Sequence, residues 1–210
     1  MSLVLLILSL LGSGLVSSLA AQGEAQRRRD AQDQLTLYRE LILGFSLANG
    51  RLPCPAPPAL AEGDPLAGVE DCTRQHGVLP WVTLSAAQLD PWGRRLTYFA
   101  SDRFTGPPAT AGGAGFGLDT VGNANVLDSL GKTLASGLPV LFFSHGPNGL
   151  GAYLADGGRF GVASGPEAEN ADADLTFVQA APGSLTQDDL LAWISSEQLK
   201  ARLVSAGRLP

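Results

Sequence analysis

The chain has 210 residues, with 14 Lys+Arg against 20 Asp+Glu, a net charge of -6 and 45% hydrophobic residues. This acidic balance excludes a basic nucleic-acid-binding protein, and two cysteines are too few for a disulfide-stapled miniprotein. Charged residues make up only 16% of the chain, below the roughly 25% usual in soluble domains, so the placement of the apolar residues is informative.

The first predicted element is a transmembrane helix over residues 1–21. Fourteen of these 21 residues are hydrophobic, the others are Ser or Gly, and the first charged residue is Glu24. About 20 apolar residues in a helix span the hydrocarbon core of a bilayer. A cleaved signal peptide is the alternative, but it would have a shorter apolar core and a basic start. We expect a face for lipid or for neighbouring helices at Leu5, Leu8, Leu11 and Leu15.

The helix is predicted to continue through residues 22–49 as an amphipathic half. No proline interrupts this segment, and apolar residues recur at spacings of three and four, as on a helix with one buried face. Asn49 and Gly50 predict the end of the helix. The predicted apolar stripe consists of Leu35, Tyr38, Leu41, Ile42 and Phe45.

Two signals disagree about topology. Arg27, Arg28 and Arg29 come after the apolar segment, and basic residues there favour a cytoplasmic location for the C-terminal side of the helix. Cys54 and Cys72 favour the opposite, because a disulfide between them would stabilise a Pro- and Gly-rich loop by roughly 3 kcal/mol in an oxidising compartment. Free thiols or a metal pair are the alternatives, but no CxxC spacing supports zinc. We therefore expect the disulfide.

The rest of the chain predicts an α+β fold, in which the long N-terminal helix packs on a small antiparallel sheet closed by a C-terminal helix. Apolar, β-prone runs predict strands at residues 96–100, 138–144, 151–154, 160–163 and 175–179. A final helix is expected from residue 185, with Thr186 as its N-cap. Its expected buried face is Leu190, Leu191, Ile194, Leu199 and Leu203.

The catalytic signals are poor, and we expect no enzyme. His145 follows Ser144, but neighbouring residues on a strand point to opposite faces, so the two cannot act as base and nucleophile. The Gly-rich residues 112–117 match neither phosphate-binding loop pattern. Trp81 and Trp92 are expected in the core or against the helix, with a sugar-stacking platform as the alternative.

An acidic cluster is the remaining candidate for a metal site. Asn170, Asp172 and Asp174 alternate as in a calcium loop, but Leu175 and Ala181 stand where that loop needs Gly and Glu. The alternatives are an irregular calcium site and a solvated acidic loop, and no other cofactor is expected. The calcium candidates are Asp172, Asp174 and Asp188.

Three motifs follow the N-terminal helix: GRLPCP at residues 50–55, GVLPW at 77–81 and DPWGRRL at 90–96. Together with the helix they resemble type IV pilin-like proteins, in the group of minor pilins and type II secretion pseudopilins. The resemblance implies a pilin-like fold and a structural subunit of a type IV pilus or type II secretion-like filament. Residues 1–21 would form the membrane and filament-core half-helix, 22–49 the amphipathic half, and 50–210 a periplasmic globular domain.

This resemblance also implies a location and partners. The chain would be a single-pass protein of the bacterial inner membrane, contacting lipid and then other pilin-like subunits, with no nucleic acid. Family members begin with a basic leader, a Gly cleavage point and a Glu at the fifth mature position. None of these features is found before Leu3 in this sequence. We therefore expect either a reading frame that starts upstream of Met1 or a truncated chain, with Met1 inside the membrane helix. The alternative function is a membrane-anchored periplasmic module that binds glycan or calcium.

Overall fold

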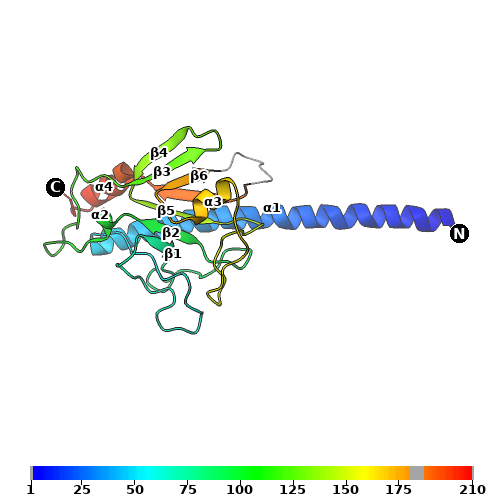
Figure 1. Cartoon of the computed structure of the whole chain (residues 1–210), viewed down its shortest axis with the longest axis horizontal. Helices are drawn as coiled ribbons and strands as arrows, with labels where there is room; N and C mark the ends of the chain where they lie inside the picture. Colours follow the sequence, from blue (N-terminus) through cyan, green and yellow to red (C-terminus); the bar gives the residue numbers. More distant parts are fainter. Residues whose placement is uncertain (1, 180–186, 210) are drawn as a thin grey trace.

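A single helix dominates the N-terminal part of the protein. The computed structural model describes residues 2–179 and 187–209, with side chains from residue 20 onward within those ranges. Helix α1 runs over Ser2–Asn49, and its N-terminal part projects well beyond the globular body (Figure 1). Gly50 ends the helix with φ +68, and a Cβ at this position would lie 2.1 Å from the Gly113 oxygen. The predicted helix end is therefore confirmed, and glycine suits it sterically.

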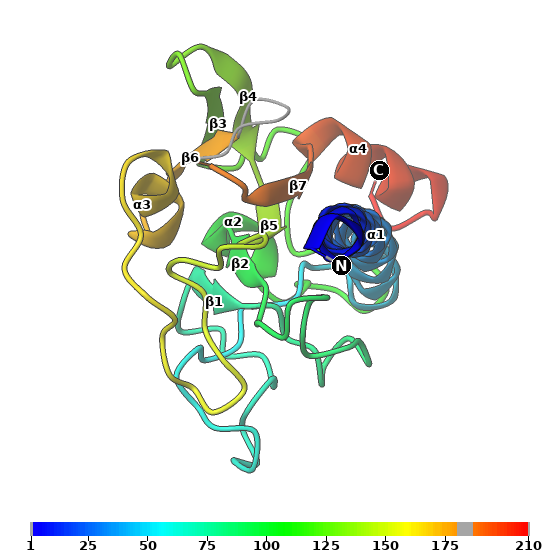
Figure 2. The same ribbon diagram turned by 90° about the vertical axis from the view of Figure 1, so that its right-hand side faces the viewer.

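The C-terminal half of α1 packs on the body. Leu35, Tyr38 and Ile42 are buried, and Leu41 and Phe45 are partly buried against the same core. Seen along its axis, α1 lies against one side of the sheet, next to the C-terminal helix (Figure 2). The predicted amphipathic stripe is thus confirmed.

The predicted location in the bacterial inner membrane, with one membrane-spanning helix and a periplasmic domain, is wrong. In the described part of the chain, no helix combines the length and apolar character that crossing a bilayer requires. A span needs about 20 consecutive apolar residues, whereas the described side chains of α1 reach Glu24 and the arginines at 27–29 within ten residues. The side chains of Leu5, Leu8, Leu11 and Leu15 lie outside the described residues.

The main sheet has four strands, and all its neighbouring strands are antiparallel. Both of its faces are buried. Tyr98 and Phe142 join the core that includes α1, while Phe99 and Phe143 join a second core on the other side. This two-sided burial explains why the strand that contains Phe142 and Phe143 is apolar without alternation. In spatial order the strands are β1 (His76–Val78), β2 (Thr97–Ala100), β5 (Val140–Ser144) and β7 (Leu190–Ile194).

A second, three-stranded sheet contributes to the second core, in the order β4-β3-β6. Strand β3 pairs antiparallel with β4 and parallel with β6, so the protein is α+β with largely antiparallel sheets rather than one small sheet. Pro139 separates β4 from β5, which divides the strand predicted at 138–144. The strand predicted at 175–179 is confirmed as β6. The strands are β3 (Ala124–Asp128), β4 (Thr133–Leu138) and β6 (Thr176–Gln179).

The C-terminal helix is shorter than predicted. The helix α4 covers Ser196–Ser205, and the Ser195 side chain caps it by accepting a hydrogen bond from the backbone N–H of Gln198. The helix predicted from residue 185 is wrong, because residues 190–194 pair with β5 as strand β7. The proposed N-cap, Thr186, lies outside the described residues.

Two predicted strands in the loop after β5 are also wrong. Residues 151–154 and 160–163 form no strand, and the ladder there is reduced to isolated bridges between Tyr153 and both Arg95 and Arg159. Gly-rich turns interrupt any longer pairing. The remaining elements are the short helices α2 (Asp102–Thr105) and α3 (Pro166–Ala171).

The predicted disulfide between Cys54 and Cys72 is confirmed, with a Cα–Cα distance of 5.0 Å. A second clasp lies beside it, since the Arg51 guanidinium donates to both Glu70 oxygens at 2.8 and 2.7 Å. Glu70 also accepts from the backbone N–H of Cys54 at 2.9 Å. Burial alone would raise the pKa of Glu70, but these hydrogen bonds and the Arg51 charge outweigh it and lower the pKa.

Candidate functional site

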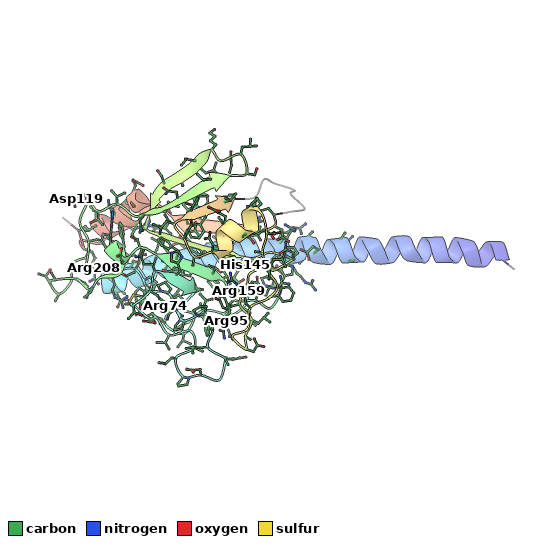
Figure 3. The ribbon with its side chains drawn as sticks, viewed as in Figure 1. Arg74, Arg95, Asp119, His145, Arg159 and Arg208 are labelled. Atoms are coloured by element: carbon green, nitrogen blue, oxygen red, sulfur yellow. A yellow bond between two sulfur atoms is a disulfide. The ribbon has the colours of Figure 1, made fainter. Side chains whose placement is uncertain are left out.

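Three buried carboxylates meet where β7 begins. Glu167 comes from α3, and Asp188 and Asp189 directly precede β7. One oxygen of each lies within 4.8 Å of the others. The imidazole of His145, just after β5, lies beside them, in the half of the body nearest to the free part of α1 (Figure 3). We call Glu167, Asp188 and Asp189 the carboxylate cluster.

Hydrogen bonds from the turn after β5 position two members of the cluster. The Asn148 side-chain amide donates to Glu167 Oε1 at 2.7 Å, and the Asp188 N–H donates to the same oxygen at 3.2 Å. The backbone N–H of Asn148 donates to Asp188 Oδ2 at 2.9 Å. Gly146, with φ +59, lets this turn approach, because a Cβ there would lie 2.2 Å from the Asp188 carbonyl oxygen.

The third member, Asp189, is held by Asn170 of α3. The Asn170 amide donates to Asp189 Oδ2 at 2.7 Å. The same side chain exchanges hydrogen bonds with the backbone of Val178 in β6, which fixes its orientation. The cluster therefore ties together α3, β6 and the start of β7.

Several polar atoms in the carboxylate cluster and in the adjacent His145 are buried without a hydrogen-bond partner among the described residues. They include Oδ1 of Asp188, Oδ1 of Asp189 and Nδ1 of His145. His145 Nδ1 lies 3.8 Å from Asp189 Oδ1, too far for a hydrogen bond. Unpaired buried acceptors are costly, so these oxygens are suited to a proton or a cation.

The electrostatics of the site agree with this. Burial raises the pKa of Asp189 to about 8, and the neighbouring carboxylates Glu167 and Asp188 add to the effect. Burial also raises the pKa of Asp188. Burial lowers the pKa of His145 to about 3, so the imidazole is neutral and its contact with Asp189 is not an ion pair.

The arrangement is suited to holding a hard divalent cation. Carboxylate oxygens are the ligands that calcium prefers, and three of them can balance its charge. By contrast, Ser144 and His145 face different partners. The Ser144 hydroxyl donates to Asp90 at 2.6 Å, whereas His145 Nε2 contacts the Thr97 hydroxyl at 2.8 Å. This geometry provides no Ser–His pair for nucleophilic chemistry.

The structure separates the calcium candidates predicted from the sequence. Asp188 belongs to the carboxylate cluster, but Asp172 and Asp174 are exposed and form a different acidic group with Glu169. The side chains of Asp172 and Asp174 accept backbone N–H bonds two residues ahead, as in ordinary turns. Glu167 and Asp189 were not among the calcium candidates predicted from the sequence, since only folding shows that they are buried together with Asp188.

The two predicted packing tryptophans contact the body and the helix. Trp81 is buried, and the Arg95 guanidinium lies 4.7 Å from the centre of its ring. The indole N–H of Trp92 donates to Glu24 of α1 at 3.3 Å. These contacts confirm the predicted roles in the core and in helix docking.

Comparisons of the chain with protein-family models, with curated proteins and with solved structures find no match.

Proposed function

We propose that this chain is a structural subunit of a filament of the type IV pilus or type II secretion class. The observation that carries the proposal is the projection of α1 beyond the globular body (Figure 1). The sequence of its first 21 residues is apolar or small throughout. An apolar helix in water gains stability when another apolar surface covers it, and the same segment of neighbouring subunits would provide that surface.

The docking of α1 also supports this proposal. The motifs that resemble pilin-like proteins attach the body to α1 or to the chain directly after it. Trp92 donates to Glu24, and the Tyr98 hydroxyl donates to the Pro53 carbonyl at 2.9 Å. The Tyr38 hydroxyl donates to the Ala87 carbonyl at 2.8 Å. A body fixed to one half of a helix leaves the other half available for assembly.

Cysteine cross-linking tests the filament proposal. A Leu8→Cys variant of the full chain is expected to form disulfide-linked dimers and larger species on mild oxidation. A Leu130→Cys variant is the control, since Leu130 is 92% exposed on the body. A shared interface raises the effective thiol concentration to the order of millimolar, so cross-linking at position 8 should be at least about tenfold faster. Equal rates, or monomers only, would contradict the proposal.

The carboxylate cluster favours a second function, calcium binding. Its support is the set of buried oxygens without partners among the described residues, Oδ1 of Asp188 and Oδ1 of Asp189, next to Glu167. Calcium there would connect α3, the turn after β5 and β7. This function does not require assembly and can accompany it.

Thermal unfolding in calcium and in EDTA tests this second function. Calcium at 100 times its dissociation constant should stabilise the protein by about 2.7 kcal/mol. Asp189→Asn should abolish the response. The substitution should reduce thermal stability less in EDTA than in calcium, because without the cation it removes an uncompensated buried carboxylate. Asp174→Asn, in the exposed acidic group, is the matched control and should respond like the parent. A response lost in the control and kept in Asp189→Asn would refute the assignment.

A further inference from the structure

We propose that a pocket between β1, β2, β6 and the end of α3 binds a single pyranose ring, as a monosaccharide or as the terminal residue of a glycan. The pocket has a volume of about 170 Å³. The residues that carry the argument are His76, Tyr153, Arg159, Asp172 and Phe177, all of which line it. This inference depends neither on filament assembly nor on calcium binding.

Flat rings form part of the pocket wall. The His76 ring is stacked with the buried Phe177 ring at 6.5 Å between centroids, with an interplanar angle of 25°. The His76 ring also contacts Phe99 at 4.9 Å, and Phe99 in turn lies 6.0 Å from Phe177, so the three rings form one group. Tyr153 provides a further ring. The C–H groups of one pyranose face carry partial positive charge, so they pack favourably on the electron-rich faces of such rings.

Polar groups around these rings remain available to a ligand. Among the described residues, the Tyr153 hydroxyl and the His76 ring nitrogens have no hydrogen-bond partner. Burial lowers the pKa of His76 in spite of the nearby charges of Asp174 and Asp172, so its neutral ring offers one donor and one acceptor. Asp172 uses Oδ1 for the Asp174 N–H, and its other oxygen is unpaired within the described residues.

The positions of the charged groups are fixed by the backbone. Arg159, which is labelled in Figure 3, lines the pocket and donates to the carbonyls of Gly151 and Ala171, which fixes the orientation of its guanidinium. Next to Asp172, Ala173 has φ +64, a left-handed conformation that is unfavourable for a non-glycine residue. Such conformations are concentrated at functional sites, and here the strained residue is part of the pocket lining.

The charge pattern selects a neutral ligand with many hydroxyl groups. Arg159 and Asp172 offer one positive and one negative group, so a cation or an anion would meet a like charge. A sugar ring presents hydroxyls that accept from the guanidinium and donate to the carboxylate, together with an apolar face for the rings. The small volume limits the site to one ring.

Saturation-transfer NMR on the full chain tests the proposal, with glucose, galactose, mannose and N-acetylglucosamine as probes. At least one sugar is expected to receive saturation and to bind with a dissociation constant of the order of millimolar. Asp172→Asn and Tyr153→Phe should each weaken binding about tenfold, because the first replaces a charged acceptor with a neutral amide and the second removes a hydroxyl. Asp64→Asn is the matched control, since Asp64 makes the same kind of exposed turn but does not line the pocket.

Three outcomes would overturn the sugar site. The first is no transfer to any of the four sugars at concentrations up to about 50 mM. The second is binding that is unchanged in both pocket variants. The third is preferential binding of a free amino acid, tested with glycine and glutamate, which would indicate a zwitterion site. Both substitutions affect partly or fully exposed side chains, so thermal unfolding should remain close to that of the parent.

Discussion

Replacing Arg95 with methionine is expected to destabilise the protein by about 3 to 5 kcal/mol, the cost of leaving buried carbonyls without their donor. Arg95 is 0% exposed, yet it forms no ion pair with a described residue. Its guanidinium donates instead to the carbonyls of Pro58 and Leu60, at 3.0 and 2.6 Å, and of Ala155, at 2.7 Å. Methionine fills much of the space but leaves the carbonyl oxygens of Pro58 and Leu60 without this donor, whereas that of Ala155 keeps the Glu62 N–H.

The position of Arg95 explains the size of this effect. The three carbonyls belong to two loops that are otherwise stabilised by few strand contacts, one after the Cys54 segment and one before Arg159. The guanidinium also lies over the Trp81 ring, so this one side chain connects the two loops with each other and with Trp81. Figure 3 shows Arg95 on the same side of the body as Arg159.

Urea denaturation followed by tryptophan fluorescence measures the loss of stability. Arg74→Met is the matched control, because Arg74 forms a half-exposed pair with Asp71 at 2.9 Å, and such pairs contribute at most about 1 kcal/mol. Arg95→Lys keeps the charge with a different donor geometry and should fall between the two. A loss below about 1 kcal/mol for Arg95→Met would show that the loops are held by other contacts.

Removing the Cys54–Cys72 disulfide is expected to destabilise the protein by about 3 kcal/mol, since the bond closes a loop with a sequence separation of 18. The Arg51–Glu70 pair spans the same loop and will remain, so the native loop conformation should survive reduction. The cost therefore arises mainly from the greater freedom of the unfolded chain.

Denaturation with and without a reductant checks this second expectation, with thiol titration to establish complete reduction. A Cys54→Ala/Cys72→Ala double variant is the control, and the reductant should not change its midpoint. An unchanged midpoint after full reduction of the parent protein would mean that the Arg51–Glu70 clasp and the surrounding packing are sufficient.

The two proposed binding sites are structurally adjacent but chemically separate. Asn170 lines the pocket and also donates to Asp189 of the carboxylate cluster. Thr97 lines the pocket and contacts His145 beside the cluster. The two experiments nevertheless test the sites separately, because Asp172 belongs to the pocket and Asp189 to the carboxylate cluster.

Local sequence patterns were sufficient for the elements whose signal is local. The spacing of Leu35, Tyr38 and Ile42 predicted the buried face of α1, and Asn49-Gly50 predicted its end. The strands β2 and β6 were recognisable from short β-prone runs. The Cys54–Cys72 pairing followed because the chain has only two cysteines. The apolar character of residues 1–21 is also a property of sequence, but it does not identify what covers that segment.

Only the tertiary structure decided features that depend on distant pairing. Residues 190, 191, 194, 199 and 203 have the spacing of one helix face, yet residues 190–194 form β7 because β5 offers a complementary edge. In the same way, Glu167, Asp188 and Asp189 become one buried cluster while Asp172 and Asp174 remain in solvent. Periodicity reports the local conformation of a segment, whereas burial and convergence depend on contacts between residues far apart in the chain, which local patterns do not contain.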